Sequence, residues 1–436
     1  MRKDLATALA GAFLSGEWTS SGLFDSAVPV VQGPTPWLPA LIRQILAVYP
    51  AAPLDRSREL AVVIGSRPAA GGAKSARPIA WPAATTQMTS NPWHLPALHG
   101  LGDLAEMLDL GATELAWFTD PRHWARSTTD RRLRHYRVTT KVAASGAVRV
   151  LEAPKYRLKS HQRRFLTEIL DRIPAHDAAH GFRAGRSVAS YAAPHGGQPV
   201  VVRMDLEGFF ASITAGRVYG ILRSAGYPEP VAHALTGLAT TVLPRAEWNA
   251  ISPPANPDLR EAHWRLGRRL AGPHLPQGAP TSPALANLAA HRLDVRLSAL
   301  ASSWGGRYTR YADDLALSGG IGWRGDVSRL VALVGDIVRD EGFRLNDRKT
   351  AVLPAHSRQV LGGLVVNERP HVSRAEVDLL RAVLHNCRRD GPSTQNRAGV
   401  PDFEGHLRGR IAWVAQHDPA RGARLRALFD AIDWSF

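Results

Sequence analysis

The sequence is poor in cysteine, in acidic residues and in long apolar runs. Its 436 residues include one cysteine, Cys387, which excludes an internal disulfide and a cysteine-based zinc site and fits a reducing cytoplasm. No apolar run approaches the roughly 20 residues that span a membrane, so we expect no membrane partner. The 38 acidic residues against 54 Lys and Arg leave a net charge of +16. This charge favours nucleic acid as a partner, although a GC-rich genome would explain part of the arginine excess.

The order of segments along the chain predicts more than one domain. The content of 44% apolar and 21% charged residues is typical of a globular protein, and the length suits two or three domains. Residues 1–125 are expected to form a partly helical N-terminal extension, with a linker-like stretch, "RPAAGGAKSARP", at 67–78. The first residues, "MRKDLATALAGAFLSGEW", predict an amphipathic helix and not a signal peptide, because Asp4 and Glu17 interrupt the apolar run.

Helices and strands are expected to mix without regular βαβ alternation. Apolar periodicity predicts helices at 159–173, 282–300 and 374–390. Ser282 is placed to cap the second of them. Residues 199–210, "PVVVRMDLEGFF", predict a buried strand that ends at an aspartate. This mixture indicates an α+β fold and not a doubly wound parallel sheet.

Two adjacent aspartates interrupt the strand-like stretch 307–320, "RYTRYADDLALSGG". Two carboxylates repel each other by roughly 4 kcal/mol at 4 Å in an effective dielectric near 20. One interpretation of Asp313 and Asp314 is a polar turn in a hairpin, which is a common use of such a pair. Asp205, at the end of the buried strand, is a third carboxylate. If the sheet places it beside the hairpin, the three can hold two Mg²⁺ ions for in-line phosphoryl transfer.

Five motifs in order resemble the palm motifs of reverse transcriptases. They are "MDLEGFF", "LPQGAPTSPALANL", "YADD", "EGFRLNDRKT" and "VLGGLVVN". Two earlier segments, "APKYRLKSHQRRFLTEIL" and "HGFRAGRSV", are similar to the fingers of bacterial, retron-type enzymes. The resemblance covers about residues 130–370 and implies a right-hand polymerase. Its expected parts are fingers at 126–199, a palm at 200–355 with an insertion at 215–270, and primer-grip strands with a helical thumb at 356–436.

The resemblance also implies which residues carry the chemistry. Asp205, Asp313 and Asp314 match the metal-binding carboxylates, and the backbone carbonyl of Leu206 is expected to join them. Lys349 matches a lysine near the leaving pyrophosphate and is a candidate general acid.

Four residues match the site of the incoming nucleotide. Phe210 matches the ring that excludes a sugar 2′-OH, so dNTPs are the implied substrates. Gln277 and Gly278 match the segment that lies against the templating pair and the incoming nucleotide. Arg149 matches a fingers residue that contacts the triphosphate, for which a guanidinium fork is suited. A solvated surface charge is the alternative for Arg149 and for Lys349.

The chain differs from the retron pattern in two places. Where retron enzymes typically carry Asn-Ala-x-x-His before the first aspartate, this chain has Tyr191 in place of Asn and keeps His195. Where they carry Val-Thr-Gly, this chain has Leu361, Gly362 and Gly363. Both differences argue against a typical retron subtype, but they leave the polymerase motifs intact.

The expected thumb carries a stripe of arginines. Arg374, Arg381 and Arg388 recur every seven residues along the 374–390 helix, which places them nearly on one face. Such a stripe can follow a phosphate backbone, and a solvated helix face is the alternative.

The resemblance implies an RNA-directed DNA polymerase that uses two Mg²⁺, with Mn²⁺ as a substitute. Its implied partners are an RNA template, the RNA/DNA hybrid and dNTPs. In a retron setting it would copy a cognate structured non-coding RNA into single-stranded DNA, with a toxin or effector protein, in anti-phage defence. The alternatives are a stand-alone defence enzyme, a group II intron-derived enzyme, and a polymerase fold that serves as a non-catalytic RNA-binding scaffold.

Overall fold

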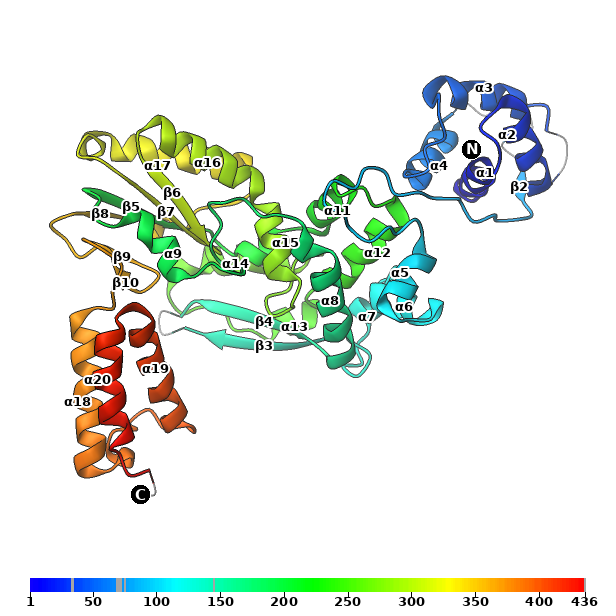
Figure 1. The fold of residues 1–436 in the computed structure, drawn as a ribbon. Helices are drawn as coiled ribbons and strands as arrows, with labels where there is room; N and C mark the ends of the chain where they lie inside the picture. Colours follow the sequence, from blue (N-terminus) through cyan, green and yellow to red (C-terminus); the bar gives the residue numbers. More distant parts are fainter. Residues whose placement is uncertain (33–34, 68–72, 74–75, 144–145, 435–436) are drawn as a thin grey trace. The chain divides into compact units, whose positions relative to one another are not determined.

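The computed structural model describes residues 1–32, 35–67, 73, 76–143 and 146–434 (Figure 1). The chain forms two compact units, each built from two segments. The first comprises Met1–Pro174 and Phe210–Ala289, and the second comprises Ala175–Phe209 and Ala290–Phe436. Helices and antiparallel strands are mixed in both units, as the sequence predicts. These units cut across the fingers, palm and thumb boundaries expected from the motifs, which stay predictions.

The first unit begins with a helical bundle that has a hydrophobic core of its own. The bundle contains α1 (Lys3–Ser15), α2 (Ser20–Ala27), α3 (Leu38–Val48) and α4 (Ser57–Ser66). Leu5, Leu9 and Phe13 of α1 recur at helical spacing and are fully buried. The expected N-terminal helix is confirmed, but it is buried on nearly every side and not amphipathic. Gly11 permits one of the contacts, because its lack of a side chain lets the backbone of Pro82 pack against the helix.

Polar contacts tie this bundle to the rest of the first unit. The Asp55 carboxylate pairs with Arg223 at 2.7 Å, and Glu229 Oε2 accepts a hydrogen bond of 2.5 Å from the backbone N–H of Arg58. The linker-like stretch 67–78 lies largely outside the described residues. Its described part belongs to the bundle, since Ala73 and Ala76 are buried in the core and β2 (Arg77–Pro78) pairs with β1 (Val31–Gln32).

The remainder of the first unit is a set of helices around one β-hairpin. The hairpin pairs β3 (Tyr136–Val142) with β4 (Val148–Pro154) in antiparallel register. The helices before α10 (Phe209–Ser212) are α5 (Leu101–Leu108), α6 (Ala112–Thr119), α7 (Trp124–Ser127) and α8 (Tyr156–Glu168). Those after it are α11 (Ala215–Ser224), α12 (Glu229–Ala239), α13 (Arg245–Asn249), α14 (Pro257–Leu270) and α15 (Ser282–Ala289).

The second unit is built on a four-stranded antiparallel sheet. Its strand order is β6-β7-β5-β8, with β5 (Val200–Asp205), β6 (Arg307–Tyr311), β7 (Asp314–Gly319) and β8 (Ala351–Pro354). β5 is the apolar strand expected from the sequence, and it lies between two neighbours with Val200, Val201 and Val202 almost completely buried. Asp205 is therefore held at the end of a buried strand with a neighbour on each side.

Helices and one short hairpin complete the second unit. The helices are α9 (Val188–Ala192), α16 (His291–Ser303), α17 (Trp323–Asp340), α18 (Arg374–Asp390), α19 (Phe403–His417) and α20 (Pro419–Asp430). The hairpin pairs β9 (Val360–Leu361) with β10 (Leu364–Val365). The last three helices pack around one apolar core and include the predicted 374–390 helix with unchanged bounds (Figure 1).

The predicted helix over 282–300 differs from the structure. The chain forms two helices there, α15 and α16, with Ala290 between them. α15 begins at Ser282 as expected, but the Ser282 hydroxyl is buried and has no hydrogen-bond partner, so the expected cap is wrong. Within the described residues, no helix combines the length and the apolar character that crossing a membrane requires.

Candidate active site

Three carboxylates gather at one end of the sheet in the second unit. Asp205, the last residue of β5, lies directly opposite Asp314, the first residue of β7. Directly opposed residues of antiparallel strands have Cβ atoms about 4.5–5.5 Å apart. The backbone N–H of Leu206 donates to the carbonyl of Asp313 at 2.9 Å, which holds the third aspartate against the end of β5. The juxtaposition expected from the sequence is therefore present.

The Asp205 carboxylate is nearly buried and is held by two side chains. Lys349 Nζ lies 2.7 Å from one carboxylate oxygen, and Asn346 Nδ2 lies 3.3 Å from the other. The backbone N–H of Asn346 also donates to the Asp205 carbonyl at 2.7 Å. The structure thus places Lys349 at the carboxylates, and its role as a general acid stays a prediction. Asn346 was not predicted, although it belongs to the "LNDRKT" motif that follows the hairpin.

The Asp314 carboxyl has a pKa raised to about 6. The largest cause is burial, and the neighbouring Asp313 and Asp205 carboxylates raise it further, against the opposing effect of Arg203 and Lys349. A divalent cation among these carboxylates would relieve this repulsion, and carboxylate oxygens are the ligands that Mg²⁺ prefers.

The donor chemistry of the three carboxylates therefore fits a metal ion. Among the described residues, no three His, Cys, Asp or Glu side chains form a group that could hold a metal ion as they stand. The Lys349 ammonium supplies a positive charge to Asp205 in this arrangement. The metal-binding role of the three aspartates, and of the Leu206 carbonyl, stays a prediction.

The segment that departs from the retron pattern supports the aspartate hairpin. The His195 side chain is buried and bridges its two strands, with Nδ1 2.7 Å from the Ser318 hydroxyl and Nε2 2.8 Å from the Thr309 hydroxyl. Burial lowers the pKa of His195 to about 3, so the imidazole is neutral and can both donate and accept. Tyr191 is also buried, and its carbonyl accepts from the Thr309 hydroxyl at 2.9 Å. This segment is thus a scaffold for the hairpin.

The predicted nucleotide-binding residues of the first unit lie on or against its β-hairpin. The backbone N–H of Glu152 in β4 donates to the Gln277 carbonyl at 2.9 Å. Gly278 has a φ of 136°, and a Cβ there would lie 3.1 Å from the Glu152 carbonyl, so only glycine fits without strain. Arg149 is exposed three residues earlier in β4. Arg149 therefore lies on the strand against which Gln277 and Gly278 pack.

A second cation that sequence reasoning missed lies on this hairpin. Lys141 of β3 is the direct cross-strand partner of Arg149, and both side chains are exposed. Like charges directly opposite each other destabilise a sheet, so this pair is unfavourable for the fold. The sequence signal was available in "TKVAASGAVRV", where the turn predicts which residues oppose each other.

Phe210 lies in the short helix α10 (Phe209–Ser212) and is half-buried. It follows Gly208, whose φ of 59° lies in the left-handed region and turns the chain after β5. Phe210 belongs to the first unit, and its role as a sugar gate stays a prediction.

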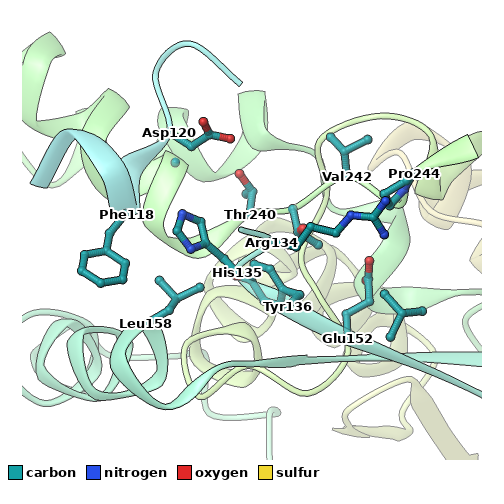
Figure 2. Close-up of a pocket in the computed structure, with 13 residues that line it drawn as sticks. Phe118, Asp120, Arg134, His135, Tyr136, Glu152, Leu158, Thr240, Val242 and Pro244 are labelled. Atoms are coloured by element: carbon teal, nitrogen blue, oxygen red, sulfur yellow. The ribbon is translucent and has the colours of Figure 1, made fainter. Parts of the chain in front are cut away.

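A small pocket in the first unit is not large enough for a nucleotide (Figure 2). Its lining includes Phe118 and Asp120, Tyr136 of β3, Glu152 of β4 and Thr240. The volume is about 30 Å³, which has room for one or two waters. This pocket is thus a packing feature behind the hairpin and not a substrate site.

The arginine stripe is exposed but partly neutralised. Arg374, Arg381 and Arg388 all lie on the exposed side of α18. Asp378 lies between the first two, 3.5 Å from Arg374 and 3.4 Å from Arg381. The seven-residue spacing predicted the shared face, but it did not reveal this carboxylate. The phosphate-binding role stays a prediction.

Comparison with known proteins identifies the family. The family model described as "Reverse transcriptase (RNA-dependent DNA polymerase)" matches residues 140–365, which include the three aspartates and Lys349. The chain belongs to the reverse transcriptase family. This confirms the right-hand polymerase fold expected from the motifs. Telomerase from Candida albicans is also similar, at 11% identity over 67% of this chain and 56% of that one, but a TM-score of 0.32 is too low to support an argument.

Similar curated proteins are retron enzymes, which confirms the resemblance to the retron type. Retron Mx65 reverse transcriptase of Myxococcus xanthus is 40% identical over 70% of this chain, and Retron Mx162 reverse transcriptase of the same organism is 37% identical over 76%. The matched region spans 66% of each of those two proteins, just under two thirds. Retron Ec86 reverse transcriptase of Escherichia coli is 29% identical over 78% of this chain and 91% of its own length.

Proposed function

We propose that this protein is an RNA-directed DNA polymerase. One observation carries the proposal: in a member of the reverse transcriptase family, Asp205 and Asp314 are in direct register at the sheet end, with Asp313 beside them. A scaffold protein has no need of three mutually repelling carboxylates at a buried strand end. Their electrostatic cost is accounted for if the site binds cations during the reaction.

The residues at the sheet end would hold two Mg²⁺ ions, or Mn²⁺ as a substitute. The ligands would be Asp205, Asp313 and Asp314 with the Leu206 carbonyl. Bound ions would supply charge stabilisation for the in-line displacement at the nucleotide phosphate. Lys349 contacts Asp205 at 2.7 Å, and its ammonium would give a proton to the leaving pyrophosphate.

The hairpin of the first unit would bind the incoming dNTP. The exposed cations Lys141 and Arg149 share one face, where a triphosphate would offset their mutual repulsion. Gln277 and Gly278 lie against the same strand and would contact the base pair being formed. Phe210 would exclude the 2′-OH of a ribonucleotide by its bulk. These roles follow from the family resemblance and the contacts within the unit.

Primer extension tests this proposal. Purified protein should extend a DNA primer on a defined RNA template with dNTPs and Mg²⁺, and nuclease treatment should identify the product as DNA. A protein that binds the RNA but incorporates no nucleotide would support the scaffold alternative. RNA polymerised from rNTPs alone would contradict both the substrate and the gate assigned to Phe210.

We further propose a retron setting, in which the protein copies part of a cognate structured RNA into single-stranded DNA. The support is the similarity to three proteins named as retron reverse transcriptases. Sequencing of the nucleic acids that copurify with the protein from its host is the test. One abundant species joining a structured RNA to a short DNA is expected. A diverse pool of cellular RNAs, or an intron RNA, would favour the stand-alone or intron-derived alternatives.

A role in phage defence with an effector protein belongs to the same proposal. It predicts that host cells lose protection against phage when Asp313 is replaced by Asn. Equal plaque counts on cells with wild-type and Asp313→Asn protein would separate DNA synthesis from any defence role.

A further inference from the structure

Arg310 is the largest fully buried side chain in the part of the chain that the structure describes. It lies in β6, three residues before Asp313, and it pairs with Asp294 of α16, whose side chain is also 0% exposed. The pairing is bidentate, with Nε 2.8 Å from one carboxylate oxygen and Nη2 2.6 Å from the other. The Tyr308 hydroxyl donates to the same carboxylate at 2.8 Å. A buried ion pair is costly to desolvate and is weak evidence for stabilisation alone.

The remaining arm of the guanidinium reaches the turn of the aspartate hairpin. Arg310 Nη1 donates to the carbonyl of Ala312 at 3.1 Å. Ala312 has a φ of 54°, in the left-handed region that a residue with a Cβ rarely adopts, and it immediately precedes Asp313. This conformation persists only where the surroundings impose it.

The neighbouring backbone leaves the turn little freedom on its other sides. A Cβ at Gly181 would lie 2.7 Å from the Ala312 nitrogen, so that segment approaches the turn closely. The backbone of Arg310 itself is held by two hydrogen bonds of 2.7 Å, to the carbonyl of Ala178 and from the N–H of His180. The guanidinium also lies 5.7 Å from the centre of the Phe209 ring, four residues after Asp205.

We propose that Arg310, oriented by Asp294, is a positioning residue that holds Ala312 in its left-handed conformation and thereby aims Asp313 and Asp314 at their site. The proposal rests on the proposed polymerase function for its catalytic consequence. It accounts for three observations together: a buried charge pair, a strained residue that is not glycine, and a hydrogen bond between them. A purely stabilising role would account for the buried charge pair alone, and not for the strained Ala312 or its hydrogen bond to Arg310.

Two variants separate positioning from stability. Arg310→Lys keeps a cation beside Asp294 but lacks the planar fork that binds the carboxylate and the Ala312 carbonyl at once. A triple variant, Arg310→Met with Asp294→Leu and Tyr308→Phe, removes the charges and the hydroxyl together. Such apolar replacement of a buried ion pair is often tolerated by the fold. Arg296→Lys is the matched control, because Arg296 lies on the same helix α16, is partly exposed, and pairs with Asp340 and Glu341 away from the hairpin turn.

Hydrogen exchange of the hairpin gives the readout that a stabilising role would not produce. In both variants, amides of residues 311–315 should exchange about tenfold faster, while those of α18–α20 keep wild-type protection. The rate constant for nucleotide addition, kcat, should fall about 100-fold because small misplacements of reacting groups have effects of that size. The KM for primer–template should change less than about threefold, and Arg296→Lys should match wild type.

Three results would overturn the proposal. One is wild-type exchange of the hairpin and wild-type kcat in the triple variant. Another is faster exchange throughout the second unit, which would show a general loss of stability. The last is wild-type exchange and kcat in Arg310→Lys, since the fork would then be unnecessary. If wild-type protein extended no primer, the proposed function would fail, whereas the exchange comparison would still decide the positioning role.

Discussion

Replacement of Asp314 by Asn should stabilise the metal-free protein while removing activity. The pKa of Asp314 is raised from 3.8 to about 6, so the folded state binds a proton that the unfolded chain releases at lower pH. Folding stability therefore falls as pH rises from about 4 to 6 and stays lowered above that window. A shift of about 2 units corresponds to about 3 kcal/mol, and solvent screening of this partly exposed group reduces the expected effect to about 1–2 kcal/mol.

Thermal unfolding in EDTA measures this effect. At pH 8, the transition of Asp314→Asn should lie above that of wild type by roughly 2–8 °C, using about 2–4 °C per kcal/mol for a unit of this size. At pH 5 the difference should be about half as large, because the Asp314 carboxyl of folded wild type is then mostly protonated and avoids part of the cost of ionisation. Asp336→Asn is the matched control: this exposed carboxylate on α17 pairs with Arg339, and its loss should shift the transition by less than about 1 °C.

Addition of Mg²⁺ should reverse the order of the two proteins. A ligand at about 100 times its Kd stabilises the folded state by about 2.7 kcal/mol, which exceeds the expected gain of about 1–2 kcal/mol in Asp314→Asn, and only wild type keeps all three carboxylates. The reasoning would be refuted if Asp314→Asn unfolded at or below the wild-type temperature in EDTA at pH 8. The reasoning would also be refuted if Asp314→Asn were as much more stable than wild type at pH 5 as at pH 8, because the stabilisation would then not arise from removal of the Asp314 carboxyl.

Three further predictions concern nucleotide and template binding. Lys141→Ala should raise the KM for dNTPs at least about tenfold with a smaller change in kcat, as loss of one charge-assisted phosphate contact predicts, and steady-state kinetics would show it. Phe210→Ala should raise incorporation of rNTPs relative to dNTPs, and an unchanged ratio would remove the gate. Replacing Arg374, Arg381 and Arg388 by Ala should reduce the slope of log template–primer affinity against log salt concentration by about two units. Equal slopes for wild type and the variant would mean that these arginines lie on a solvated face.

The sequence predicted the aspartate site because its motifs resemble those of a known family. The local pattern alone indicated a buried strand that ends at Asp205 and a hairpin that turns at Asp313. It left open whether these strands pair, and in the structure β5 and β7 do pair, with Asp205 opposite Asp314. The 374–390 helix was predicted with correct bounds because its apolar residues follow one face without interruption. Motif order then supplied the family.

What the sequence could not show depends on contacts between distant segments. Nothing in the local pattern indicates that Arg310 is buried against Asp294, because an arginine in a strand is ordinarily exposed. The break at Ala290 has no proline or glycine to mark it. Tertiary packing also buried α1 on nearly every side, where its periodicity predicted one apolar face.

Single-nucleotide addition tests the central claim most directly. Wild-type protein, Asp313→Asn and the control Asp336→Asn would each be mixed with an RNA template, a DNA primer and the next dNTP in Mg²⁺, and the extended primer measured over time. Wild type and Asp336→Asn should extend at equal rates, and Asp313→Asn should be slower by at least about 1,000-fold, since metal-site charge stabilisation contributes several kcal/mol. Extension by Asp313→Asn within tenfold of wild type would contradict the assignment of the reaction to the three carboxylates.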